Sequence, residues 1–207
     1  PVSETSVNKR RRLPEWMRAR MDDQQRFLVL CIMCGLICGL VGVGFHLAIH
    51  GLFDLVWILA RSQSFWGFIA VMLLAPTLGG LLVGLAVQKW APQCAGSGIP
   101  QTKAAYFNKG GHISALTGIW RFILGTLYVG LGNSLGREGP TVHVSAAVGS
   151  KIGRWGVRDP LRKQAMVPVG VAGGIAAAFN APIAAIMFVF EDLLDDFSTK
   201  ALGGIAI

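Results

Sequence analysis

Long apolar stretches without charged side chains constrain this chain more than any other feature. Three uncharged stretches cover residues 27–52, 65–88 and 165–190, and a fourth, 113–136, is interrupted by Arg121 alone. Each reaches or exceeds the roughly 20 residues that an α-helix needs to cross the hydrocarbon core of a bilayer. A soluble protein with long core helices is the alternative, but it would need polar faces that these segments lack. Because 53% of the residues are hydrophobic and 14% are charged, we predict an all-α, polytopic transmembrane protein.

Glycine spacing within the first stretch indicates close helix packing. Gly35 and Gly39 lie four residues apart, and small residues at this spacing let a second helix approach the backbone closely. The same stretch holds Cys31, Cys34 and Cys38. A metal or redox site would need a second ligand pair or a water-accessible setting, so we interpret this CxxC pattern as accidental and predict no metal site.

The net charge of +8 is concentrated in two basic clusters. Positive residues mark the cytoplasmic side of a membrane protein, so both clusters, and with them the N-terminus, are predicted to face the cytoplasm. Anionic lipid headgroups are the expected neighbours. Nucleic-acid binding is the alternative, which the lack of interleaved aromatic residues and the directly following span disfavour. The clusters consist of Lys9, Arg10, Arg11, Arg12, Arg18, Arg20 and Arg26, and of Lys151, Arg154, Arg158, Arg162 and Lys163.

The first 26 residues are polar and basic, and they lack the apolar core and the small-residue cleavage site of a signal peptide. The first span is therefore expected to stay in the chain. Residues 13–26 are predicted to form a short, partly amphipathic helix at the membrane interface, with Pro14 near its first turn. We accordingly divide the chain into a cytoplasmic segment, 1–26, and a transmembrane domain, 27–207.

Three glycine- or proline-rich segments interrupt the apolar pattern after Lys89. The first break is Gly-Ser-Gly-Ile-Pro at 96–100, the second break is Gly-Arg-Glu-Gly-Pro at 136–140, and the third break is Asn-Ala-Pro at 180–182. Backbone at such breaks loses its internal hydrogen bonds, which membranes tolerate only where the backbone is buried in protein or lines a cavity. Broken and re-entrant helices of this kind form the ion sites of many transporters.

The first break has the composition of an anion cradle. Pro100 can occupy an early helical position, and Ser97 lies just ahead of it with a hydroxyl free to donate. Exposed backbone N–H groups, the positive end of the helix dipole and one hydroxyl together bind a monovalent anion without a full counter-charge. An ordinary helix cap explains the same spacing equally well.

The second break repeats this design and adds two charges. Pro140 again lies inside a helix start, and a carboxylate at a helix N-terminus is electrostatically favourable, so Glu138 could occupy the place of an anion. An ionisable group beside an apolar span is a functional hypothesis by default. The alternative is a buried structural ion pair of Glu138 with Arg137 or Arg121.

Together with Gly-Gly-Ile-Ala-Ala-Ala-Phe-Asn-Ala-Pro-Ile at 173–183 and Phe-Val-Phe-Glu-Asp at 188–192, the two breaks closely resemble the CLC family of chloride channels and proton–chloride antiporters. The likeness covers about 27–197 in the right order, including Arg121 sixteen residues before Arg137. It implies the N-terminal half of an inverted-repeat CLC fold, a homodimer, no cofactor, and a bacterial-type inner (plasma) membrane. The implied selectivity filter consists of Gly96, Ser97, Gly98, Ile99, Pro100, Gly136, Arg137, Glu138, Gly139 and Pro140.

The resemblance also implies roles for individual residues. Ser97 is expected to coordinate the central chloride, and Glu138 to be the outer gating and proton-transfer group. The inner proton-transfer glutamate of the family's exchangers falls on Asp192, whereas Glu191 is the less favoured candidate. We therefore expect a proton–chloride antiporter, with a passive chloride channel as the alternative. The family's second half, with its third filter segment and chloride-coordinating tyrosine, does not follow within these 207 residues, so a truncated repeat is expected.

A competing pattern, Gly-Asn-Ser-Leu-Gly at 132–136, fits the nucleophile elbow of serine hydrolases, with His143 nearby in sequence. It suggests an intramembrane hydrolase acting through Ser134. That elbow requires a preceding strand, however, and a glycine-rich membrane helix is predicted there. We expect no catalytic activity, and no metal-ligand spacing among His46, His50, His112 and His143.

Overall fold

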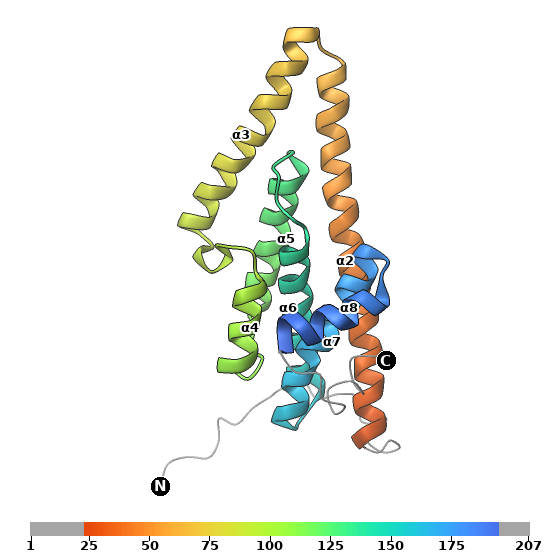
Figure 1. The fold of residues 1–207 in the computed structure, drawn as a ribbon. Helices are drawn as coiled ribbons and strands as arrows, with labels where there is room; N and C mark the ends of the chain where they lie inside the picture. The colour runs from red at the N-terminus through yellow and green to blue at the C-terminus, as the bar shows by residue number, and fades with distance from the viewer. Residues whose placement is uncertain (1–22, 195–207) are drawn as a thin grey trace.

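The computed structural model describes residues 23–194, and these residues fold into helices without a strand (Figure 1). The all-α prediction is therefore confirmed for this range. The elements are α2 (Asp23–Arg61), α3 (Phe65–Lys89), the short 3-10 helix η1 (Pro92–Cys94), α4 (Ile99–Asn108), α5 (Ala115–Gly130), α6 (Glu138–Gly156), α7 (Pro160–Phe179), α8 (Pro182–Phe188) and the π-helical turn η2 (Val189–Leu194).

The two N-terminal helices form a long hairpin that extends beyond the other elements (Figure 1). By length and composition both α2 and α3 can cross a membrane. Large apolar side chains on both helices are more than half exposed, which water does not favour but lipid or further protein would. These side chains are Leu36, Leu40, Leu47, Leu55 and Ile58 on α2, and Leu73, Leu74, Leu78, Leu81, Leu82 and Leu85 on α3.

Helix α2 is longer than the sequence pattern predicted. It has 39 residues, about 58 Å at 1.5 Å per residue, and continues past the charged residue Asp54 to Arg61. The apolar residues after Asp54 extend the helix, and it ends where the Ser62 hydroxyl donates to the Leu59 carbonyl. Residues 23–26, predicted to end an interfacial helix, form the first turn of α2 instead; residues 13–22 of that prediction lie outside the described range.

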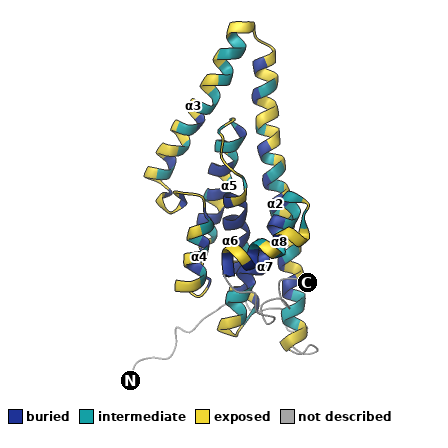
Figure 2. Ribbon diagram, in the orientation of Figure 1, coloured by how far each residue is buried: buried dark blue, intermediate teal, exposed yellow. Residues whose placement is uncertain are grey.

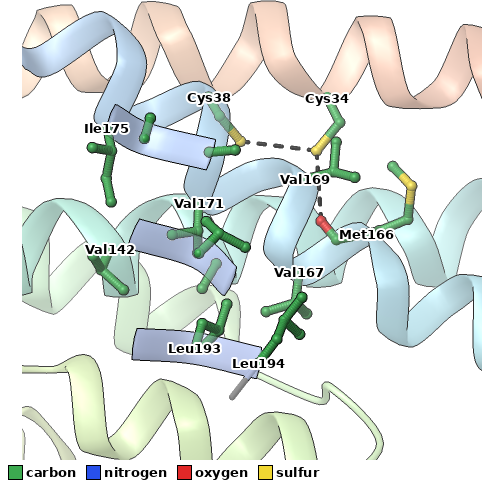
Figure 3. Packing of buried hydrophobic residues seen from close by; sticks show 14 of the residues in the cluster. Cys34, Cys38, Val142, Met166, Val167, Val169, Val171, Ile175, Leu193 and Leu194 are labelled. Atoms are coloured by element: carbon green, nitrogen blue, oxygen red, sulfur yellow. Dashed lines mark hydrogen bonds between the residues drawn. The ribbon is translucent and has the colours of Figure 1, made fainter. Parts of the chain in front are cut away.

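The core lies where α6 and α7 pack against each other and against the lower half of α2 (Figure 2). Apolar side chains from α7 and η2 fill it, and the thiols of α2 lie against it (Figure 3). The Cys34 Sγ atom lies 3.9 Å from the Met166 carbonyl oxygen and 3.9 Å from Cys38 Sγ, and the latter lies 3.5 Å from the Ser145 carbonyl oxygen. These cysteines are small core residues with weak S–H donors, as the accidental interpretation of the CxxC pattern expects.

Glycines bring α2 and α7 close together, as their spacing in the sequence indicated. A Cβ atom added to Gly173 would lie 2.9 Å from the Gly35 Cα, and one added to Gly42 would lie 2.7 Å from the Gly174 carbonyl oxygen. No side chain fits between the backbones at these points. The two helices therefore pack backbone to backbone, as in small-residue interfaces of membrane proteins.

The third break divides the apolar stretch 165–190 into two helices, as expected. Helix α7 ends at Phe179, and Asn180 adopts the left-handed conformation with φ 53° that often follows a helix end. Helix α8 then begins with Pro182, a favoured first helical residue. The turn redirects the chain, so that α8 and η2 cross in front of α7 (Figure 1).

We predict that Gly42→Ala destabilises the protein by about 1–3 kcal/mol, because the new methyl group overlaps the α7 backbone. Gly44→Ala is the matched control, since nothing lies within 4 Å of a Cβ at that position of the same helix. It is expected to be neutral or stabilising, because alanine favours helix over glycine. The measurement is the apparent melting temperature in detergent, and equal melting temperatures for the two variants would contradict the packing.

Candidate functional site

The first break forms a tight turn that ends at the N-terminus of α4. Gly98 is the residue before the helix and has φ 107°, a conformation that favours glycine. Its N–H donates to Gln101 Oε1 at 3.0 Å, and Gln101 Nε2 donates to the Ala95 carbonyl at 2.7 Å. Pro100 is the second helical residue and Ser97 lies ahead of the helix, as predicted. The first N–H groups of α4 have no partner within the helix.

The second break ends at the N-terminus of α6. Arg137 precedes the helix, Glu138 is its first residue and Pro140 its third. The Glu138 side chain is exposed and folds back over Gly136, where a Cβ atom would overlap the carboxylate. A carboxylate in the first turn is stabilised by the helix dipole.

The two breaks meet, although they lie 40 residues apart in the sequence. A Cβ atom on Gly98 would lie 2.8 Å from the Gly139 carbonyl oxygen, and one on Gly139 would overlap the carbonyl group of Ser97. The N-termini of α4 and α6 are thus in backbone contact at Ser97 and Gly139. Ser97 and Glu138, both exposed, therefore flank the same junction of two helix N-termini.

Within residues 23–194, Glu138 forms no ion pair. The ion pair found in this range joins Arg26 to Asp23 at 3.3 Å. The proposed pairing with Arg137 or Arg121 is therefore wrong. The Arg137 guanidinium donates to His46 Nδ1 at 2.6 Å and lies over the Phe179 ring, 4.7 Å from its centroid.

Arg137 thus ties the start of α6 to α2 and to the end of α7. Its contact with His46 requires a neutral imidazole with Nδ1 as the acceptor, because a guanidinium has no acceptor atom.

Arg121 binds the backbone of the first break and not the Glu138 carboxylate. It is 4% exposed on α5, and its Nη1 atom donates to the Gly96 carbonyl. Within the described residues its Nε and Nη2 atoms have no hydrogen-bond partner. Arg121 lines a cleft of about 640 Å³, whose lining also includes Ser97, Tyr128 and Pro140. A buried guanidinium without a carboxylate partner favours an anion nearby.

Sequence reasoning missed a buried polar pair beneath the first break. Thr102 on α4 is 0% exposed and His143 on α6 is 4% exposed, with 2.9 Å between Thr102 Oγ1 and His143 Nδ1. Thr102 lies four residues after Gly98, the spacing at which a hydroxyl reaches the carbonyl one turn back, and this could have been noticed. No local pattern indicates the contact with His143, 41 residues away.

The proton-transfer candidates Asp192 and Glu191 lie on η2, and both are exposed. Their neighbours Phe190 and Leu193 are buried in the core, so the two carboxylates lie on the outward side of this turn. The turn that carries them is π-helical rather than α-helical. The structure does not bring either carboxylate to the junction of the two breaks.

The hydrolase pattern lacks its structural context. Ser134 lies in the connection between α5 and α6, which follows a helix and not a strand, and His143 contacts Thr102 and Gly98. Residues 23–194 also hold no cluster of three or more His, Cys, Asp or Glu side chains that could bind a metal ion.

Comparison with known proteins decides the family. Residues 79–207 match the family described as voltage gated chloride channel, which is more than half of the chain. The chain belongs to this family, the CLC family. Among curated CLC relatives, the H(+)/Cl(-) exchange transporter ClcA of Vibrio parahaemolyticus is 36% identical over 180 residues and that of Vibrio cholerae is 34% identical over 187 residues. Each alignment covers 82% of this chain and 37% of the relative, so the chain spans little more than a third of their length.

Solved CLC structures share the fold. A eukaryotic CLC transporter superposes with a TM-score of 0.77 at 20% identity, covering 88% of this chain and 36% of that chain. A slow cyanobacterial Cl-/H+ antiporter superposes with a TM-score of 0.71 at 28% identity, covering 87% of this chain and 44% of that chain. The helices described above are therefore those of a CLC membrane protein.

We predict that Gly98→Ala disrupts the junction of the two breaks. Both this change and the control Gly110→Ala place alanine at a positive φ, which costs about 1–2 kcal/mol, but only at Gly98 does the Cβ atom also meet backbone, at 2.8 Å. The apparent melting temperature should fall further for Gly98→Ala than for Gly110→Ala. A smaller or equal loss at Gly98 would show that the two segments are not in close contact.

Proposed function

We propose that this chain forms part of a proton-coupled chloride antiporter of the CLC family. The observation that carries this proposal is the backbone contact between the N-termini of α4 and α6, which Ser97 and Glu138 flank. The Vibrio relatives are named H(+)/Cl(-) exchange transporters, and one similar structure is a Cl-/H+ antiporter, which supports the same activity. No catalytic activity and no cofactor are part of the proposal.

The anion site of this proposal consists of the first and second breaks. The Ser97 hydroxyl and the unpaired N–H groups at the start of α4 would donate to chloride, and both helix dipoles present their positive ends to it. Such partial charges stabilise a monovalent anion without holding it as strongly as a fixed ion pair would, so the ion can also leave. The buried guanidinium of Arg121 adds a favourable long-range contribution.

Glu138 is the gate of this proposal. Its carboxylate lies at the N-terminus of α6, where a chloride ion would be stabilised by the same dipole, so carboxylate and chloride compete for one place. Protonation removes the negative charge and frees the site. Binding of a proton and binding of chloride are thereby coupled through one side chain, which is what exchange requires.

The proposed orientation is supported by basic residues that gather at one end of the described helices. Arg26 from the start of α2 and Arg158 and Arg162 from the turn between α6 and α7 line one hollow. We place this end, and the N-terminus with it, in the cytoplasm of a bacterial-type inner membrane. Glu138 starts α6 and Gly156 ends it, so at 1.5 Å per residue the gate lies about 27 Å along α6 from this end.

Asp192 is the proposed inner proton-transfer group, with Glu191 the less favoured candidate. Asp192 follows the Phe-Val-Phe-Glu pattern at the position of the family's inner glutamate, and it keeps the carboxylate while shortening its reach by one methylene. Its exposure on η2 supports exchange of protons with solvent. The presence of two proton-transfer candidates, Glu138 and Asp192, favours the antiporter over the passive channel as the proposed function.

The proposed assembly is a homodimer of subunits in a lipid bilayer, in which the described helices are the first half of an inverted repeat. The apolar side chains exposed on α2 and α3 are the surfaces that lipid or further CLC helices would cover. A second half would complete the filter around the junction of α4 and α6.

Replacing Glu138 with Gln is expected to abolish proton movement while passive chloride flux remains, because an uncharged side chain neither competes with chloride nor carries a proton. Glu138→Ala should behave in the same way. Wild-type flux should rise as the pH falls, and this dependence should be lost in both variants. The measurement is chloride-driven proton flux in liposomes containing the protein expressed from its whole gene.

Asp192→Asn is expected to remove proton flux and to keep chloride flux, whereas the neighbouring control Glu191→Gln should retain both. Loss of coupling in the control alone would assign the inner role to Glu191. Chloride flux without proton flux in the wild type would show a channel, and normal coupling in Glu138→Gln would contradict the proposed gating role of Glu138. A fluorophosphonate probe that labels Ser134 would instead support the hydrolase alternative.

A further inference from the structure

Gly98, Thr102 and His143 form a small hydrogen-bond network beside the first break. The Thr102 hydroxyl donates to the Gly98 carbonyl at 2.8 Å, and the Thr102 N–H donates to the same oxygen at 3.0 Å. His143 Nδ1 lies 2.9 Å from Thr102 Oγ1 and 3.3 Å from the Gly98 carbonyl oxygen. All three residues belong to the contact between α4 and α6.

This pattern assigns the tautomer of His143. The single hydroxyl proton of Thr102 is used toward Gly98, so Thr102 Oγ1 accepts from His143. The Gly98 carbonyl is also an acceptor only, so His143 Nδ1 carries the proton and donates to both oxygens. His143 Nε2 is then an unprotonated acceptor, which has no partner among residues 23–194.

Donors thus hold the carbonyl oxygens on both sides of Ser97. The Gly96 oxygen accepts from Arg121 and the Gly98 oxygen accepts from Thr102 and His143. Peptide bonds are planar and trans, and no cis bond is present in the described chain, so C=O and N–H of one peptide unit point in opposite directions. Fixing the Gly96 oxygen therefore fixes the Ser97 N–H, and fixing the Gly98 oxygen fixes the Ile99 N–H.

We propose that His143, acting through Thr102, is a positioning residue that aims the Ile99 N–H toward the bound anion and thereby sets anion affinity. This inference rests on the proposed anion site at the first break. Without the Thr102–His143 pair, the Gly98 carbonyl oxygen keeps the Thr102 N–H as its donor but loses the two side-chain donors. The Gly98–Ile99 peptide can then tilt more freely, because glycine at a positive φ has wide conformational freedom. An Ile99 N–H tilted away from the site would attract the anion less strongly.

The alternative role for this pair is simple packing of α4 against α6. A packing role lowers the melting temperature when it is removed and leaves the chloride affinity of the folded protein unchanged. A positioning role raises the dissociation constant and the KM for chloride while flux at saturating chloride is largely kept. A raised KM for chloride with unchanged flux at saturating chloride would therefore indicate positioning, whereas a lower melting temperature with unchanged KM would indicate packing.

The first experiment compares Thr102→Val with Thr102→Ser in the protein expressed from its whole gene. Valine keeps the shape of threonine and removes the hydroxyl, whereas serine keeps the hydroxyl and removes one methyl group. Isothermal titration with chloride is expected to give an affinity about five-fold weaker for Thr102→Val, the effect of one lost hydrogen bond. Thr102→Ser should bind chloride within about two-fold of the wild type.

The second experiment compares His143→Asn with His143→Leu. The asparagine amide nitrogen lies as many bonds from the backbone as Nδ1, so it can donate to Thr102 and should restore chloride affinity, whereas leucine cannot. His143→Leu and Thr102→Val combined should weaken binding no more than either change alone, because both break one unit. If His143→Leu does not fold, the Thr102 pair still decides the question.

The inference is overturned if Thr102→Val and Thr102→Ser bind chloride like a wild type that itself binds and transports chloride. It is also overturned if the two variants weaken affinity equally, because the hydroxyl would then have no specific role. A wild type without chloride binding or flux overturns the proposed function, and this inference with it. The wild-type measurement therefore distinguishes the two failures.

Discussion

The contact between Ser97 and Gly139, where the N-termini of α4 and α6 meet, determines the form of the rest of the structure. Unpaired backbone N–H groups are tolerated at membrane depth only where protein or a polar cavity surrounds them. Glycine at 98 and 139 lets the two backbones touch and both glycines are buried, while Ser97 and Glu138 beside them stay exposed. Side chains of neighbouring helices support this contact. Helix α5 supplies Arg121 beneath it, and α2 and α7 hold Arg137 beside it.

Much of this fold can be predicted from the sequence, because short-range features determine where its helices begin and end. The bounds of α3 and the positions of the three breaks depend on apolar composition, glycine and proline, which fix backbone conformation within a few residues. The end of α2 was not predictable in the same way. A single charge, Asp54, suggested the end of a span, but the apolar residues around it carry the helix on to Arg61. One charged residue is a weak signal for a helix end.

The contacts that organise the candidate site were not predictable, since they join residues far apart in the sequence. An ion pair of Glu138 with Arg137 or Arg121 was the alternative that the sequence left open. The chain instead brings His46 to Arg137 from 91 residues away, and this partner competes with the ion pair. The Thr102–His143 contact depends likewise on how α4 packs on α6. Local pattern identifies which residues are available, whereas packing decides which of them meet.

The charges around the junction explain why a carboxylate and an anion would alternate there. Arg121 is buried on α5 and, within the described residues, has no carboxylate partner. A buried charge without compensation is costly, and the cleft that Arg121 lines also reaches Ser97 and Pro140. One negative charge in this cleft would balance the guanidinium, while two would repel each other at short range. Within the proposed function, this repulsion favours one negative charge at a time near the junction, either chloride or the ionised Glu138 carboxylate.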